Sequence, residues 1–159
     1  MRAAAWLTSH CIRTRVCGVA VMATLLAGCV MPAPSDSSYA DKAQRSLQTA
    51  ASQTATVQVV LSQSLAGQML QRFADQTVSE TEDSLSSVSD QFTAMQPPPS
   101  AGADEVRDRT TTLLSQASDA VATARIALRR NDRPQMAASE KQLSAVTEKL
   151  TDAQGQVDS

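Results

Sequence analysis

The sequence has little of the side-chain chemistry on which most metal sites and hydrolases depend. Its 159 residues include one histidine and three cysteines, and aromatic residues make up only 3%. His10, Cys11 and Cys17 all lie among the first 28 residues, so the rest of the chain has no histidine and a single cysteine, Cys29. Beyond residue 28 this excludes histidine-ligated metal sites, Ser-His and Cys-His catalysis, and an internal disulfide.

Other catalytic and ligand-binding motifs are also missing. The glycines after residue 28 are Gly67, Gly102 and Gly155, which lie too far apart to form a loop that cradles phosphate. No lysine has a serine three positions before it, so the Ser-x-x-Lys arrangement is absent. We therefore expect no catalytic residue, no metal site and no cofactor.

Paired acids are the remaining candidates for acid–base or cation-binding chemistry. No cluster of aromatic residues surrounds them to form a pocket. We interpret them as a solvent-facing helix surface and as the start of a helix, where the dipole favours negative charge. The pairs are Glu80 with Asp83, and Asp104 with Asp108.

The first 28 residues have the organisation of an export signal. They contain Arg2, Arg13 and Arg15 but no acid, and an uncharged, mostly apolar run follows over residues 16–27. This run is shorter than the roughly 20 residues that a membrane-spanning helix needs. A short apolar run after a basic region is typical of a signal peptide.

The run ends in Leu26-Ala27-Gly28-Cys29, which resembles the lipobox of bacterial lipoproteins. The resemblance implies that the signal peptidase recognises Leu26, Ala27 and Gly28 and cleaves before Cys29, whose thiol receives a diacylglyceryl group. We expect residues 1–28 to be removed and the protein to be anchored on the extracytoplasmic side of the cell membrane. In a host with two membranes, Val30 after the cysteine leaves transport to the outer membrane open.

The charge of the exported part argues against some partners. All 16 acids follow residue 28, whereas three of the 14 basic residues precede it, which leaves 11 bases and a net charge of −5. Excess negative charge disfavours binding to nucleic acid and to anionic lipid. We therefore expect no nucleic-acid partner and attachment to the membrane through the lipid on Cys29.

Residues 29–40 contain proline and serine and are predicted to be a linker, followed by a helical domain over residues 41–157. No strand-like alternation follows, and the apolar residues repeat with helical spacing. The pattern fits one long helix over residues 41–95, or two helices with a bend within Ala74–Ser79. The expected core positions are Val57, Leu61, Leu65, Met69, Phe73, Val78, Leu85, Val88, Phe92 and Met95.

Three prolines at residues 97–99 end that arm. The next helix is expected from about Asp104 to Arg130, and Asp132 with Gln135 is expected to cap a last helix that has Pro134 in its first turn. The short connection between these two helices predicts an antiparallel hairpin. The fold class is therefore all-α, a three- or four-helix bundle with a C-terminal antiparallel helical hairpin. The last two helices are expected to bury Val106, Leu113, Leu114, Ala117, Ala120, Val121, Ala124, Leu128, Met136, Leu143, Val146 and Leu150.

Two surfaces could meet a partner. Residues 46–71 carry no charge, and Val59 and Leu70 lie opposite the ridge that contains Leu61 and Leu65, so they form a candidate partner face. A cluster of arginines near the hairpin turn could dock an anionic partner or a lipid headgroup. It also complements the dipole at a helix C-terminus, which is the simpler interpretation. The cluster consists of Arg125, Arg129, Arg130 and Arg133.

The sequence predicts a non-catalytic, lipid-anchored envelope protein that presents a helical bundle to an unknown envelope protein or to a second copy of itself. The alternative is a lipoprotein that binds a small apolar ligand in a cavity lined by Phe73, Phe92 and methionines. Three later stretches also loosely resemble uncharacterised small helical lipoproteins of high-GC Gram-positive bacteria, a resemblance that implies no known activity. These stretches are residues 39–45, 95–99 and 124–130.

Overall fold

The computed structural model describes residues 35–157, and in this part of the chain every regular element is an α-helix. This confirms the all-α prediction for the described residues. The predicted signal peptide and the lipid-bearing Cys29 lie outside them. The helices are α2 (Asp36–Leu65), α3 (Gln71–Thr93), α4 (Ala101–Arg129) and α5 (Arg133–Val157).

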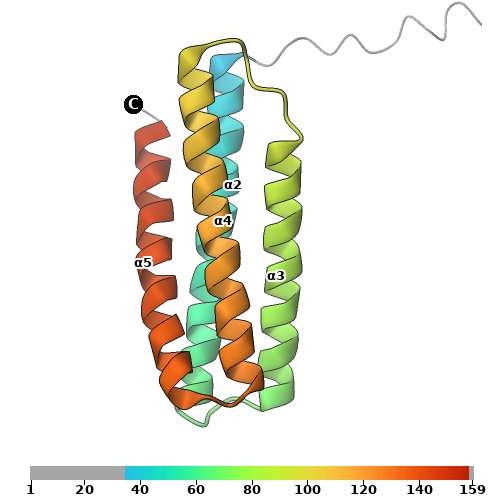
Figure 1. The fold of residues 1–159 in the computed structure, drawn as a ribbon, viewed down its shortest axis with the longest axis vertical. Helices are drawn as coiled ribbons and strands as arrows, with labels where there is room; N and C mark the ends of the chain where they lie inside the picture. The colour runs from blue at the N-terminus through green and yellow to red at the C-terminus, as the bar shows by residue number, and fades with distance from the viewer. Residues whose placement is uncertain (1–34, 158–159) are drawn as a thin grey trace, which may run out of the picture. The chain divides into compact units, whose positions relative to one another are not determined.

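The four helices pack side by side with alternating direction (Figure 1). Helices α2 and α4 contact each other and both of the remaining helices, whereas α3 and α5 do not touch. We call the end that contains the 66–70 and 130–132 connections the lower end, as it appears in Figure 1. The upper end contains the starts of α2 and α4 and the 94–100 connection.

The predicted linker boundary at residue 40 is wrong. Helix α2 begins at Asp36, and the Ser35 hydroxyl caps it by accepting a hydrogen bond of 3.2 Å from the Ser38 N–H. A side-chain acceptor at this position satisfies one of the free donors of a helix start. Tyr39, expected in the linker, is only 1% exposed and belongs to the core. The helical domain therefore includes residues that the composition assigned to a spacer.

Residues 41–95 form parts of two helices, and the chain turns at residues 66–70 rather than bending at 74–79. Gly67 has a φ of 71°, and the Gln68 N–H donates to the Gln63 carbonyl at 2.9 Å. This is the Schellman arrangement that ends a helix at a left-handed residue. The turn explains why Phe73, expected in the core, is 61% exposed: it lies on a different helix from Leu65, so their spacing no longer means a shared face.

Capping residues also define the start and the end of α4 and the start of α5. Helix α4 begins before the predicted Asp104, because the Ser100 hydroxyl accepts a hydrogen bond of 3.2 Å from the Ala103 N–H. Asn131, with a φ of 51°, ends α4 in the same way that Gly67 ends α2. The Asp132 carboxylate accepts a hydrogen bond of 3.1 Å from the Gln135 N–H, which confirms the predicted cap of the last helix.

The core consists of the apolar faces of all four helices. The predicted core residues of α4 and α5 are buried, except that Val106 and Leu113 are partly buried. Several core positions of α2 and α4 are fully buried alanines, such as Ala50 and Ala120. None of the described helices has the length and apolar character needed to cross a bilayer. The largest fully buried side chains include Tyr39, Phe92, Leu47, Leu61, Leu85, Leu114, Leu143 and Leu150.

Candidate functional site

The described surface exposes four large apolar side chains: Val59 (58%), Leu70 (81%), Phe73 (61%) and Ile126 (46%). Val59 and Leu70 are the residues that the sequence placed on a candidate partner face, and their exposure is what that prediction requires. Leu61, predicted to face inward, is fully buried. Val59 lies about 9 Å along α2 from the end of that helix, at 1.5 Å per residue. It is therefore separated from Leu70, which follows the turn after α2.

Leu70 and Phe73 lie together at the lower end because of how α3 begins. The Leu70 carbonyl accepts hydrogen bonds of 3.0 Å from the N–H groups of Phe73 and Ala74, which fixes the first turn. Within this turn the core-facing position belongs to Ala74, which is fully buried. Phe73 is therefore held on the outside, one helical step from the core. We call Leu70, Arg72 and Phe73 the tip surface.

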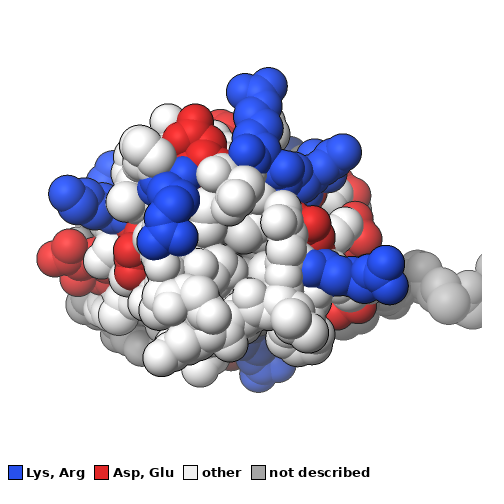
Figure 2. Space-filling model, turned by 90° about the horizontal axis from the view of Figure 1, so that it is seen from below, with Lys and Arg blue, Asp and Glu red and all other residues white. Residues whose placement is uncertain are grey.

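At this end of the bundle, basic and acidic side chains lie around the edge of an otherwise uncharged surface (Figure 2). Two of the predicted arginines have structural partners. The Arg133 guanidinium donates to the Leu65 carbonyl at the C-terminus of α2, and Arg125 Nε lies 2.8 Å from Glu82 Oε2. The side chains of Arg129 and Arg130 form no hydrogen bond or ion pair with any residue in the described range.

A surface groove of about 460 Å³ lies beside the tip surface, between α3 and α4. We call it the arginine groove. Asp75 is the acidic residue that lines this groove. One oxygen of its carboxylate is buried without a hydrogen-bond partner among residues 35–157. Arg72 also has no hydrogen-bond or ion-pair partner among these residues. The groove is lined by Arg72, Asp75, Gln76, Ser79, Arg125 and Arg129.

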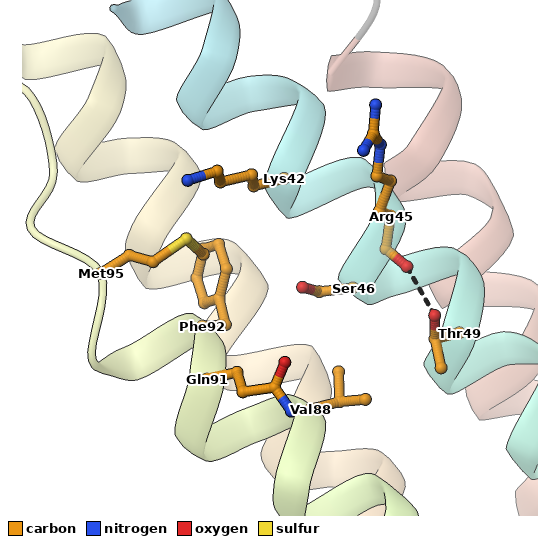
Figure 3. A pocket seen from close by; sticks show the side chains of 8 residues that line it. All are labelled: Lys42, Arg45, Ser46, Thr49, Val88, Gln91, Phe92 and Met95. Atoms are coloured by element: carbon orange, nitrogen blue, oxygen red, sulfur yellow. Dashed lines mark hydrogen bonds between the residues drawn. The ribbon is translucent and has the colours of Figure 1, made fainter. Parts of the chain in front are cut away.

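A second groove of about 410 Å³ lies between α2 and α3 towards the upper end (Figure 3). Phe92 and Met95 line it, as the ligand-binding alternative anticipated, but Phe73 is not part of it. Lys42 reaches across towards Met95, and Arg45 points away (Figure 3). Phe92 is only 1% exposed, so it offers a ligand almost no surface. A small-molecule site usually encloses most of its ligand, and this groove is open to solvent.

The paired acids gain no chemical role from the fold. Glu80 accepts a hydrogen bond of 2.6 Å from the Gln76 side chain one turn earlier, on the exposed face of α3. Asp104 and Asp108 are exposed on the first turns of α4. Within residues 35–157 no group of three or more His, Cys, Asp or Glu side chains is placed to hold a metal ion.

Sequence reasoning missed two residues of the lower end. Phe73 was assigned to the core, and Arg72 was not singled out at all. Gly67 was the available signal, because glycine is the residue that most often ends a helix in the left-handed conformation. A break there makes residues 70–73 the start of a new helix and leaves their outward faces free.

No protein-family model matches this chain, and the comparisons with curated proteins and with solved structures also found no match.

Proposed function

We propose that this protein is a lipid-anchored, non-catalytic protein of the cell envelope that binds another protein through the lower end of its helical bundle. The proposal takes the helices as one stable bundle that includes the α4–α5 hairpin. The observation that carries it is the exposure of Leu70 and Phe73, at 81% and 61%, at the N-cap and in the first turn of α3. Aromatic residues and arginines are enriched in protein interfaces, and both types occur here.

The proposed anchor limits how far the start of α2 can lie from the membrane. From Cys29 to Ser35 the chain reaches at most about 20 Å when extended, at roughly 3.3 Å per residue. Helix α2 has 30 residues and is about 45 Å long, at 1.5 Å per residue. A bundle standing on a lipid at Cys29 would therefore present the tip surface on the side away from its membrane, where an envelope protein can reach it.

The anchor is tested by extracting the protein from membranes of its own host and measuring the mass of its N-terminal peptide. We expect an acylated Cys29 as the first residue, with residues 1–28 absent. Cys29→Ala should leave the membrane fraction. A chain that begins at another residue, or a Cys29→Ala protein that is processed and membrane-bound in the same way, would contradict the anchor.

The binding role is tested with a photo-crosslinking amino acid placed at position 73 of the full chain in its host. We expect a covalent adduct with another protein, and Leu70→Ser should reduce its yield at least fivefold. The matched control places the same crosslinker at Ser115, an exposed position in the middle of α4. Equal adduct yields from positions 73 and 115, or adducts with lipid alone, would contradict the proposal.

A further inference from the structure

Neither an ion pair with a described residue nor the helix dipole accounts for the position of Arg72. It is exposed in the first turn of α3 and has no ion pair or hydrogen bond through its side chain to the described part of the protein. The N-terminus of a helix carries partial positive charge, so a cation in the first turn is unfavourable there. Arg129 and Arg130 lie at the C-terminal end of α4, where the same dipole favours them. Dipole complementation accounts for those two residues and not for Arg72.

Arg72 and Arg129 line the same groove from opposite sides, one from α3 and the other from α4. The third guanidinium in the groove, Arg125, is already paired with Glu82. Once Arg125 is paired with Glu82, the remaining charged groups of the groove are Arg72, Arg129 and Asp75, with a net charge of +1. Neither Arg72 nor Arg129 has an ion-pair partner among the described residues. A carboxylate accepts two parallel hydrogen bonds from a guanidinium, so an acidic group suits this groove.

The apolar part of the surface adjoins the same cation, because Leu70 is the N-cap of α3 and Phe73 follows Arg72 in its first turn. We propose that the arginine groove and the tip surface together bind an acidic segment of a partner protein. In this complex a carboxylate lies between Arg72 and Arg129, and an apolar side chain of the segment packs on Phe73. This inference rests on the proposed function and adds the chemistry of the partner to it.

An anionic membrane offers related chemistry, but the proposed anchor disfavours it. For the tip surface to enter the anchoring membrane end-on, the start of α2 would have to stand about 45 Å from that membrane. The chain from Cys29 to Ser35 reaches less than half of that distance, about 20 Å. The proposed anchor thus disfavours end-on insertion, whereas the carboxylates of a partner protein stay accessible to the tip surface, and we take an acidic protein segment as the occupant.

The test uses the full chain in nanodiscs of neutral phosphatidylcholine and a fluorescent 16-residue peptide of Glu, Leu and Ala. A peptide with Gln in place of every Glu is the matched probe. We expect the Glu peptide to bind at least tenfold more tightly by fluorescence anisotropy, with the difference shrinking as salt is raised because the charges involved are exposed. The double variant Arg72→Glu, Arg129→Glu should abolish the preference.

The matched control is the double variant Arg109→Glu, Lys149→Glu, which changes the net charge equally at exposed positions on another face. It should bind the Glu peptide within twofold of the unmodified protein. Equal losses in the two double variants, no preference for the Glu peptide, or Arg72-dependent binding to phosphatidylglycerol vesicles in its place would overturn the inference. Far-ultraviolet circular dichroism of both variants should match the unmodified protein, since all four positions are exposed.

The crosslinking experiment separates this inference from the proposed function. If position 73 still forms its protein adduct when Arg72 and Arg129 are reversed to Glu, the binding role stands and the acidic partner is wrong. If the Glu peptide binds as expected while position 73 yields no protein adduct in the host, the groove chemistry stands and the proposed function fails.

Discussion

At the upper end of the bundle Tyr39 and Phe92 are each 1% exposed, with ring centroids 5.6 Å apart, whereas at the lower end Phe73 is 61% exposed. Burying an aromatic ring stabilises a fold by several kcal/mol. Tyr39 and Phe92 contribute this stabilisation at the upper end, and Phe73 does not contribute it at the lower end. At the start of α3 the core-facing position is occupied by Ala74, which is fully buried. The exposure of Phe73 therefore follows from the order of residues at the start of α3, which places Ala74 on the core side and Phe73 on the solvent side.

The charges at the two ends differ as well. At the upper end Asp36 and Asp104 lie in the first turns of α2 and α4, where the helix dipole favours them. At the lower end Arg129 stands in the last turn of α4, again with the dipole, but Arg72 stands against it at the start of α3. The first-turn charges of α2 and α4 at the upper end agree with the helix dipole, whereas at the lower end Arg72 opposes it.

The largest expected difference between the two ends is the cost of removing an aromatic ring. Phe92→Ala should lower the free energy of unfolding by about 3–5 kcal/mol, because it leaves a cavity in the core. Phe73→Ala should change it by less than about 0.5 kcal/mol, because the ring lies mostly in solvent. Chemical denaturation of both variants measures the difference. A loss above about 2 kcal/mol for Phe73→Ala would mean that this ring packs against the bundle in solution.

The same contrast applies to the aliphatic residues of α2 and the turn after it. Leu61→Ala should cost about 2–5 kcal/mol because Leu61 is fully buried. Val59→Ser and Leu70→Ser should each stay within about 0.5 kcal/mol, since both side chains are exposed. Urea titrations of the three variants are sufficient. Similar large losses at all three positions would show that α2 is enclosed on every side and would remove the candidate partner face.

The sequence predicted the helical class and most of the core because those depend on local periodicity. Leu114 and Val121 lie seven residues apart within α4, Leu143 and Leu150 lie seven apart within α5, and all four are buried. The core prediction for Phe73 is wrong because it counts the spacing from Leu65 across Gly67, where the chain reverses direction. An apolar repeat carries no information about whether the helix continues, whereas a left-handed glycine does.

The candidate site was predictable only in part. Outward positions on α2, such as Val59, follow from helical geometry alone. The arginine groove does not, because it depends on which helices become neighbours: Arg72 and Arg129 are far apart in the chain and share a groove only because α3 packs on α4. Tertiary packing creates that juxtaposition, and no single-helix pattern contains it.

Helix capping gives a smaller effect that links two helices at the upper end. The Ser100 hydroxyl accepts from the Ala103 N–H and donates to the Asp36 carboxylate at 3.1 Å. Ser100→Ala should cost about 1 kcal/mol, mostly from the lost cap of α4. Ser100→Ala combined with Asp36→Ala should cost less than the sum of the single changes, because they share one hydrogen bond. Strict additivity in thermal unfolding would show that this bond contributes nothing.

The smallest effect concerns Tyr39, whose hydroxyl is buried without a hydrogen-bond partner among residues 35–157. A buried, unpaired hydroxyl costs desolvation energy, so Tyr39→Phe should raise the free energy of unfolding by about 0.5 kcal/mol. Burial also raises the pKa of Tyr39 above 10.0; Arg107 opposes this rise, and Asp104 and Asp108 add to it. At high pH the unfolded chain therefore loses this proton before the folded chain does.

Stability that depends on the neutral Tyr39 hydroxyl is accordingly complete below pH 10 and declines as the pH rises past the tyrosine's unfolded value of 10.0. The unfolding free energy of the unmodified protein should fall more steeply between pH 9 and 11 than that of Tyr39→Phe, so the stability advantage of the variant should widen with pH. All other ionisable groups are the same in both proteins and cancel in the difference. Parallel pH curves would mean that the Tyr39 hydroxyl reaches solvent in the folded state and that the upper end is less closed than its packing indicates.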